Sequence, residues 1–490
     1  MPISLAISLL LGADLIRVDV PDHPDAIATS ELGSTLWEPP TDGTPWREEP
    51  IPVTDTWESE EAVQAVNADE WHDAGFDGSG VRIAIFDVQW YGVETNENVS
   101  HLETHDCFAH RSCDLSIDTI NPQFAFETGG HGIACAEVIQ TVAPGAELFL
   151  VRVNTLTALE NASNWAVREG IDIVSMSMSF FNESFYDGTG SVNAAVDVLV
   201  AGGVLMVTSA GNYAQQHYRD VFHDPDLDDR HDFAWGTEYL PIYLPEGTSK
   251  INLIWDDFGA CGTTDLDGYV YESDGDLVGR STRSQDPTSD NCQPTESISA
   301  RASEEGWHYL LVHRVAGRPD AHFDVNVRGG TVHQAIPEAS ITDPGSHPHA
   351  FTVGAVHVDG YKANPVQSYS SQGPTSSGVA KPDIVGPDGL TSSVYGNRRF
   401  FGTSASTPVV AAMVALIMSK DPKKTPREAA TSLQATAMND RAVWAKADAA
   451  QGAGKARLPS LQQNDNGCGN GTPLLMILCW IPIGRLRQRN

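Results

Sequence analysis

The sequence is short of positive charge. Its 490 residues include 30 Lys and Arg against 65 Asp and Glu, which gives a formal net charge of −35. Nucleic acids and anionic lipid surfaces are bound through clusters of Lys and Arg. The composition therefore argues against nucleic acid as a partner and against membrane adhesion through a basic patch. The acidic excess suits an exported, calcium-binding protein, and solubility alone explains it equally well.

Cysteine is also scarce, with seven residues in the chain. Cys107 and Cys113 flank a short loop, whereas Cys261 and Cys292 bracket a polar segment. Two local disulfides formed in an oxidising compartment are consistent with this spacing, although sequence alone does not fix the pairing. Cys135 lies within a helical pattern and is expected to be a small buried hydrophobe.

Long hydrophobic runs are missing from both ends. The apolar segment 1–12 resembles the core of a signal peptide but lacks a basic start. The apolar run 474–483 has about ten residues, whereas a bilayer span needs ~20. A Gly- and Cys-containing segment precedes that run and Arg residues follow it, an order that resembles C-terminal sorting tails of exported bacterial proteins. We therefore expect an extracellular or cell-surface protein whose tail anchors it transiently to the membrane.

Strand-like and helix-like patterns alternate through much of the chain. This alternation predicts an α/β fold with a doubly wound, mostly parallel sheet. Active sites in such sheets lie at the carboxyl ends of the strands. An amino-terminal helical pattern covers 59–74, with Ser59 as the expected N-cap. The expected strands are 81–86, 146–153, 171–177 and 204–209, and the expected helices are 132–141, 156–169 and 191–201.

The alternation stops near Ala214 and resumes near Ala350. Short strand-like runs separated by turn signals fill the interval, which predicts an inserted all-β domain of the sandwich or jelly-roll type. The predicted organisation is a signal-like segment 1–12, a linker or short pro-segment 13–58, a first catalytic part 59–235, the insert 236–330, a second catalytic part 331–455, and a linker with the sorting-like tail 456–490.

Four polar residues occupy positions that suit hydrolytic chemistry. Asp87 closes an apolar strand, His131 opens a helix between two glycines, and Asn212 follows another strand. Ser404 lies at the start of an apolar helix, where the helix dipole and unsatisfied amides stabilise developing negative charge. A serine hydrolase needs a nucleophile, a base, a carboxylate that orients the base, and donors for the oxyanion. No Gly-x-Ser-x-Gly elbow surrounds Ser404, which argues against an esterase of the α/β-hydrolase type.

Several stretches in this order resemble the subtilisin-like serine peptidases, or subtilases. The resemblance covers about 60–450 outside the insert and implies a subtilisin-like fold that hydrolyses peptide bonds in proteins or peptides, needs no cofactor for its chemistry, carries structural calcium and is a monomer. The matching stretches are Val81 to Asp87, Gly130-His131-Gly132, Val142 to Leu148, Gly170 to Ser177, Ser209 to Asn212, Tyr369 to Pro374, Lys381 to Ile384 and Gly402-Thr403-Ser404.

The resemblance also implies roles for individual residues. Asp87, His131 and Ser404 would form the catalytic triad, and the Asn212 side chain with the Ser404 amide would form the oxyanion hole. Ser177, Met178, Ser179 and Gly211 would bind the substrate.

Two stretches depart from the family pattern. Val88-Gln89-Trp90 follows the aspartate, so a bulky aromatic lies beside the triad. Phe180 and Phe181 replace a glycine-rich stretch, and we expect these rings to narrow or reshape the specificity pocket.

Other interpretations compete with parts of this assignment. A catalytically inactive, subtilase-fold binding protein would keep the fold without a reactive serine. Ser406 is a rival nucleophile but lies deeper in the helix, which favours a structural role. The cluster His101, His105, Cys107 and His110 matches no standard zinc spacing, and a solvated loop explains it better. The acidic residues 224–232 lack the EF-hand spacing, so the sequence names no calcium ligands.

Overall fold

The computed structural model describes residues 59–93, 96, 99, 103–108, 111–117, 129–233, 236–258, 263–285, 293–395, 399–438 and 449–461. The described residues up to Pro459 belong to one compact unit. The predicted signal-like segment, the pro-segment and nearly all of the predicted tail lie outside the described residues, as do Cys261 and Cys292.

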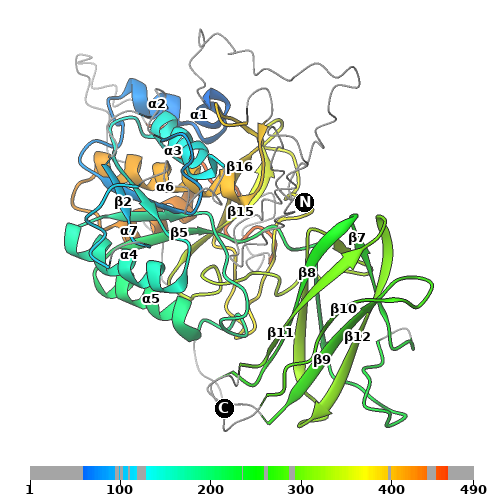
Figure 1. The fold of residues 1–490 in the computed structure, drawn as a ribbon. Coiled ribbons are helices and arrows are strands. Elements are labelled where there is room, and N and C mark those ends of the chain that lie inside the picture. The colour runs from blue at the N-terminus through cyan, green and yellow to red at the C-terminus, as the bar shows by residue number, and fades with distance from the viewer. Residues whose placement is uncertain are drawn as a thin grey trace, which may run out of the picture. The chain divides into compact units, whose positions relative to one another are not determined.

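A parallel sheet forms the centre of the first part of the fold (Figure 1). Its order among the described residues is β16-β15-β5-β4-β1-β3-β2, and each neighbouring pair is parallel. Strand β1 lies between β3 and β4, so the chain winds outward in both directions from it. The strands are β1 (Arg82–Asp87), β2 (Glu103–Asp106), β3 (Glu147–Arg152), β4 (Ile173–Met176), β5 (Leu205–Ser209), β15 (Phe351–His357) and β16 (Ile384–Asp388).

Helices cover both faces of this sheet (Figure 1). On one face, α4 (Leu156–Glu169) and α5 (Gly190–Ala201) pack together over a core that includes Phe86 and Phe149. On the other face, α3 (His131–Val142) packs against α6 (Thr403–Lys420), which crosses β4, β5, β15 and β16. Burial of both faces explains why β1 is apolar almost throughout. This architecture confirms the predicted α/β class.

Helix α6 is apolar on all sides. Among the described residues it alone is long and apolar enough to cross a membrane, by length and composition. Its residues are buried almost without exception. A helix that is hydrophobic all round and packed on every side is the core helix of a globular protein, and this one carries Ser404 in its first turn.

The amino-terminal helical pattern forms two helices instead of one. Helix α1 (Glu60–Val66) ends at Asn67, whose φ of 67° lies in the left-handed region, and α2 (Ala68–Asp73) begins directly after it. Ser59 stands at the N-cap position, but its hydroxyl makes no capping bond and donates to the carbonyl oxygen of Thr391 at 2.7 Å. The predicted N-cap position is therefore confirmed, while the hydroxyl joins α1 to β17 (Leu390–Thr391), which pairs with β18 (Arg399–Phe400).

Two antiparallel sheets follow β5 in the chain (Figure 1). One has the order β11-β8-β13-β6 and the other β10-β9-β12-β7-β14, with an apolar core between them that includes Trp255 and Phe323. The strands are β6 (His217–Val221), β7 (Leu240–Leu244), β8 (Gly247–Trp255), β9 (Asp265–Tyr271), β10 (Leu277–Ser281), β11 (Thr295–Ala302), β12 (Gly306–Ala316), β13 (His322–Arg328) and β14 (Thr331–Val332).

The antiparallel sheets draw strands from a wider span than the predicted insert. They begin at His217, whereas the sequence places the start of the insert at 236. The domain boundaries themselves stay a prediction. At the other end of the compact unit, Leu458 donates its amide to Val66 at 2.9 Å, and Trp71 of α2 donates its indole N–H to Pro459 at 3.0 Å. Helix α7 (Pro426–Thr436) packs against α6 nearby.

Candidate active site

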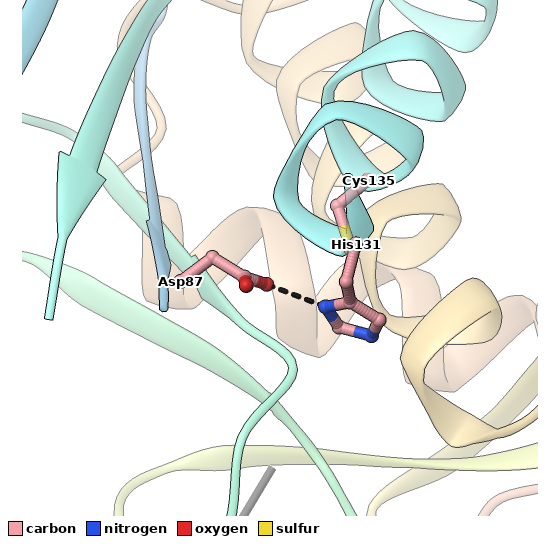
Figure 2. Close-up of side chains that lie close together, drawn as sticks. All are labelled: Asp87, His131 and Cys135. Carbon is pink, nitrogen blue, oxygen red and sulfur yellow. Dashed lines mark hydrogen bonds and ion pairs between the residues drawn. The ribbon is translucent and has the colours of Figure 1, made fainter. Parts of the chain in front are cut away.

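The carboxyl end of β1 holds a buried carboxylate–imidazole pair (Figure 2). Asp87 ends the strand, His131 is the first residue of α3, and His131 Nδ1 lies 2.6 Å from Asp87 Oδ2. The other carboxylate oxygen accepts the amides of Val88 at 2.8 Å and Gln89 at 3.0 Å. An ionised carboxylate can only accept, so His131 donates from Nδ1 and its Nε2 is the nitrogen that can act as a base.

The loop after Asp87 fixes this pair from one side. The indole N–H of Trp90 donates to the Asp87 carbonyl oxygen at 3.0 Å, and its ring lies against Gly132. A Cβ atom at Gly132 would lie 2.7 Å from that ring, so only glycine fits there. The Gly132 amide also donates to the Gln89 carbonyl oxygen at 3.1 Å. Trp90, the bulky aromatic that the sequence places beside Asp87, thus contacts both the end of β1 and the first turn of α3.

Ser404 is the second residue of α6 and is buried. Its carbonyl oxygen accepts from the Ser177 hydroxyl at 3.1 Å and lies 3.8 Å from Cys135 Sγ. Cys135 is one turn along α3 from His131 (Figure 2). The first turns of α3 and α6 therefore face each other, with the end of β4 beside them, and this arrangement brings Ser404 into the neighbourhood of His131.

Asn212 follows β5 and is tied to the residue before Ser404. Its Oδ1 accepts from the Thr403 amide at 3.0 Å and from the Thr403 hydroxyl at 3.2 Å. These bonds orient the side-chain amide so that its donor end, Nδ2, lies away from Thr403. Gly211 precedes it with a φ of 99°, where a side chain is strained, and a Cβ there would meet the Tyr213 ring at 2.7 Å.

The predicted substrate-binding stretch continues from β4. Ser177, Met178 and Ser179 are all buried. The rings of the next two residues lie in different surroundings: Phe180 packs into the apolar core that contains Phe86 and Phe149, and Phe181 lies against Tyr213, with ring centroids 5.1 Å apart. The backbone of Phe180 pairs with that of Asp343. The expected effect of the two rings on the specificity pocket stays a prediction.

Phe181 also touches the inserted sheets. The Arg328 guanidinium of β13 lies 4.7 Å from its ring centroid. Asn182 donates from Nδ2 to Asn252 at 3.2 Å and to Ser297 at 2.8 Å, which are residues of β8 and β11. The four-stranded sheet therefore packs against the segment that directly follows the predicted substrate strand.

Three residues around the candidate site were not singled out from the sequence. The Phe400 ring lies edge-on to the His131 imidazole, with centroids 5.5 Å apart, and Tyr395 stacks on Phe400 at 5.1 Å. Asp388 ends β16 and accepts the amide of Gly402 at 3.0 Å. An acidic residue directly after a buried strand is the signal that identified Asp87, and the same signal would have marked Asp388.

The possible metal sites receive little support. Asp87, His131 and Cys135 lie within ligand distance of one another, but Asp87 and His131 are already hydrogen-bonded together. Cys107 is joined to Cys113 in a disulfide, as predicted, and cannot serve as a thiolate ligand. His105 Nδ1 lies 2.9 Å from the Cys113 carbonyl oxygen. His101 and His110 lie outside the described residues.

The acidic loop 224–232 remains a possible calcium site. The carboxylates of Asp224, Asp226 and Asp228 converge, and oxygen ligands of this kind suit Ca²⁺. Both oxygens of Asp224 already accept backbone amides, and Arg314 lies 3.4 Å from one of them. Structural calcium therefore stays a prediction.

The rival serine has a structural contact. Ser406 is fully buried, and its hydroxyl donates to the carbonyl oxygen of Gly386 in β16 at 3.1 Å. This bond fastens α6 to the sheet two residues from the candidate nucleophile.

The profile described as Subtilase family matches residues 109–229 and 329–471, more than half of the chain. The chain belongs to the subtilase family. The unmatched interval between the two ranges contains most strands of the antiparallel sheets. Asp87 precedes the first matched range, so its assignment in this subtilase depends on the contact with His131.

Similarity to individual subtilases is partial. The serine protease AprX of Bacillus subtilis is 33% identical over 156 residues, which cover 27% of this chain and 31% of AprX. A thermostable alkaline protease of Halalkalibacterium halodurans is 23% identical over 169 residues, covering 31% of this chain and 42% of that protein. The chain thus matches less than half the length of either relative.

A solved structure resembles the fold over a longer range. The CspB protease of Clostridium perfringens superposes with a TM-score of 0.57 at 16% identity, covering 81% of this chain and 97% of that chain. Identity this low supports the fold alone.

Proposed function

We propose that this subtilase is a serine endopeptidase in which Ser404 is the nucleophile, His131 the general base and acid, and Asp87 the residue that orients His131. The observation that carries the proposal is the buried Asp87–His131 hydrogen bond of 2.6 Å at the carboxyl end of β1. It lies next to the helix start that carries Ser404. Family membership supports the same reaction class.

In this mechanism the Ser404 hydroxyl attacks the scissile carbonyl and gives its proton to Nε2 of His131. Asp87 holds the imidazole in the tautomer that leaves Nε2 as the acceptor and stabilises the imidazolium that forms. Two amide donors on the other oxygen fix the orientation of the carboxylate. The protonated imidazole then delivers the proton to the leaving amine.

The oxyanion is expected to bind between the Asn212 side-chain amide and the Ser404 amide. Thr403 donates two hydrogen bonds to Asn212 Oδ1, so the Nδ2 end of the side-chain amide points away from Thr403. Removing one such donor lowers the rate by about 100- to 1000-fold in serine peptidases. The backbone of Ser177, Met178 and Ser179, with Gly211, is proposed to bind the substrate chain beside this site.

We place the protein outside the cytoplasm, at the cell surface or in the medium. The Cys107–Cys113 disulfide supports an oxidising compartment. Its substrates are proposed to be proteins or peptides, and the protein is proposed to act as a monomer. Transient anchoring through the tail remains a prediction, because those residues lie outside the described part of the chain.

A fluorophosphonate probe tests the central assignment. We expect the purified, folded protein to be labelled and to digest casein, and we expect Ser404→Ala to lose both activities. Ser406→Ala is the matched control and should keep labelling, because Ser406 serves the packing of α6. Folded wild-type protein that takes up no label would contradict the proposal and favour an inactive, substrate-binding subtilase.

A further inference from the structure

A second carboxylate at the end of a strand contacts the turn that precedes the candidate nucleophile. Asp388, the last residue of β16, is fully buried, and three donors converge on it, two from the loop that carries Gln367 and Tyr369 and one from Gly402. Its Oδ1 accepts from Gln367 Nε2 at 3.0 Å. Its Oδ2 accepts from the Gly402 amide at 3.0 Å and also from the Tyr369 hydroxyl. A carboxylate carries no proton, so it can accept all three hydrogen bonds at once.

Gly402 links Asp388 to the candidate nucleophile, because it lies two residues before Ser404 in the chain. It is the N-cap of α6, with φ of 102° and ψ of 167°, a backbone region that is essentially restricted to glycine. The next amide, of Thr403, is held by Asn212 at 3.0 Å. Side-chain oxygens at the ends of two strands therefore hold both amides that immediately precede Ser404.

We propose that Asp388 is a positioning residue that sets the conformation of the Gly402-Thr403-Ser404 turn and thereby the placement of the Ser404 hydroxyl. This inference rests on the proposed role of Ser404. Negative charge is favoured at a helix N-terminus, and a charged acceptor makes a stronger hydrogen bond to a backbone amide than a neutral one. Burial of a carboxylate is unfavourable unless hydrogen bonds compensate it, and each of the three donors contributes to that compensation.

Replacing the carboxylate should affect the chemical step more than substrate binding. In Asp388→Ala the Gly402 amide loses its charged acceptor and keeps only the Tyr369 hydroxyl, at 3.2 Å. That hydroxyl also loses its own acceptor, so the turn relaxes. Misplacing a reacting group by ~1 Å lowers the rate by about 100-fold. We expect a fall of that order in kcat for a peptide substrate and in the rate of fluorophosphonate labelling. The KM should change little, because the proposed substrate strand is not touched.

Asp388→Asn is the conservative variant. It keeps an oxygen for Gly402, and Gln367 can turn its own amide to accept from the new donor, so most of the rate should return. Asp383→Asn is the matched control, at a carboxylate just before β16 that accepts from Thr352 at 2.8 Å and Lys381 at 2.5 Å. It should leave kcat and labelling unchanged even if it lowers the melting temperature.

Amide hydrogen exchange of the peptide spanning Gly402 separates this inference from the proposed function. We expect faster exchange in Asp388→Ala than in the wild type or in Asp383→Asn, whether or not the protein is active. Unlabelled wild-type protein with this exchange difference would refute Ser404 as nucleophile and keep Asp388 as the residue that holds the turn. Unchanged exchange, or wild-type kcat in Asp388→Ala, would overturn the role of Asp388.

Discussion

Asp343 offers a direct test of how burial changes the pKa of a carboxyl group near the predicted substrate-binding residues. It is fully buried, and its backbone carbonyl accepts the Phe180 amide at 2.8 Å. Its carboxyl accepts from Asn193 at 2.9 Å, from Ser184 at 2.5 Å and from Ser346. Burial raises the pKa of Asp343 from 3.8 to about 6, although these hydrogen bonds act in the opposite direction.

The raised pKa sets the sign and size of a pH effect on stability. Folding favours the protonated form of Asp343, so its contribution to stability is complete below about pH 3.8 and is lost as the pH rises through about 6. At 1.36 kcal/mol for each pKa unit, the loss is about 3 kcal/mol. Burial also raises the pKa of Glu183, and repulsion from Asp343 adds to that shift.

Asp343→Asn removes this titration and keeps the shape of the side chain. The Ser184 oxygen, which already accepts the Tyr186 amide at 2.9 Å, has a second lone pair for the new amide donor. Relative to its parent, the variant should therefore gain about 2.5 kcal/mol of unfolding free energy between pH 4 and pH 8.

Urea unfolding followed by tryptophan fluorescence measures this difference across the pH range. Both proteins should carry Ser404→Ala so that self-digestion does not interfere. Asp73→Asn, at an exposed carboxylate, serves as the control for the substitution itself. A difference that stays constant with pH for Asp343→Asn would refute the raised pKa.

Four further substitutions have expected outcomes. Asp87→Asn favours the wrong His131 tautomer and should lower kcat about 10⁴-fold on a chromogenic peptide, with little change in melting temperature; a near-normal kcat would contradict the orienting role. Arg219→Leu removes the guanidinium that lies 2.5 Å from the fully buried Asp324, and should cost about 3–5 kcal/mol in chemical denaturation. Arg230→Leu, at a more exposed pair, should cost at most about 1 kcal/mol, so equal losses would count against the burial argument. Cys107→Ser opens a loop closed over six residues and should lower the unfolding free energy by about 2 kcal/mol, measured against the oxidised parent.

The central sheet was predictable because its strands are buried on both faces. Four apolar runs in the sequence correspond to β1, β3, β4 and β5 within two residues at each end, and the helix predicted at 156–169 is α4. The amino-terminal pattern was less informative. Nothing in its apolar spacing distinguishes one helix from two, and the left-handed conformation of Asn67 decides the break.

Strand β6, at the edge of the four-stranded antiparallel sheet, was also not predictable from apolar spacing. Strand β6 reads His-Tyr-Arg-Asp-Val, which has little apolar content for a strand. Its polar residues are satisfied by partners far along the chain: His217 contacts the Ile336 carbonyl at 2.7 Å, and Arg219 binds Asp324 of β13. A strand that gains its stability from such distant polar contacts gives no periodic signal of its own.

At the candidate site, the sequence pattern likewise fails to distinguish two acidic residues at strand ends. Asp87 and Asp388 both end buried strands of one parallel sheet, so the sequence pattern alone assigns them the same character. Their partners differ: Asp87 accepts from an imidazole, whereas Asp388 accepts from the backbone amide of Gly402. A carboxylate beside an imidazole can control a proton, while one beside a backbone amide can only control position. Asp87 could be assigned because glycines mark His131 in the sequence, but the donor that defines Asp388 is a main-chain N–H that every residue except proline carries. The chemical role of a strand-end acid is therefore decided by the donor that the fold brings to it, and a backbone donor becomes visible only in three dimensions.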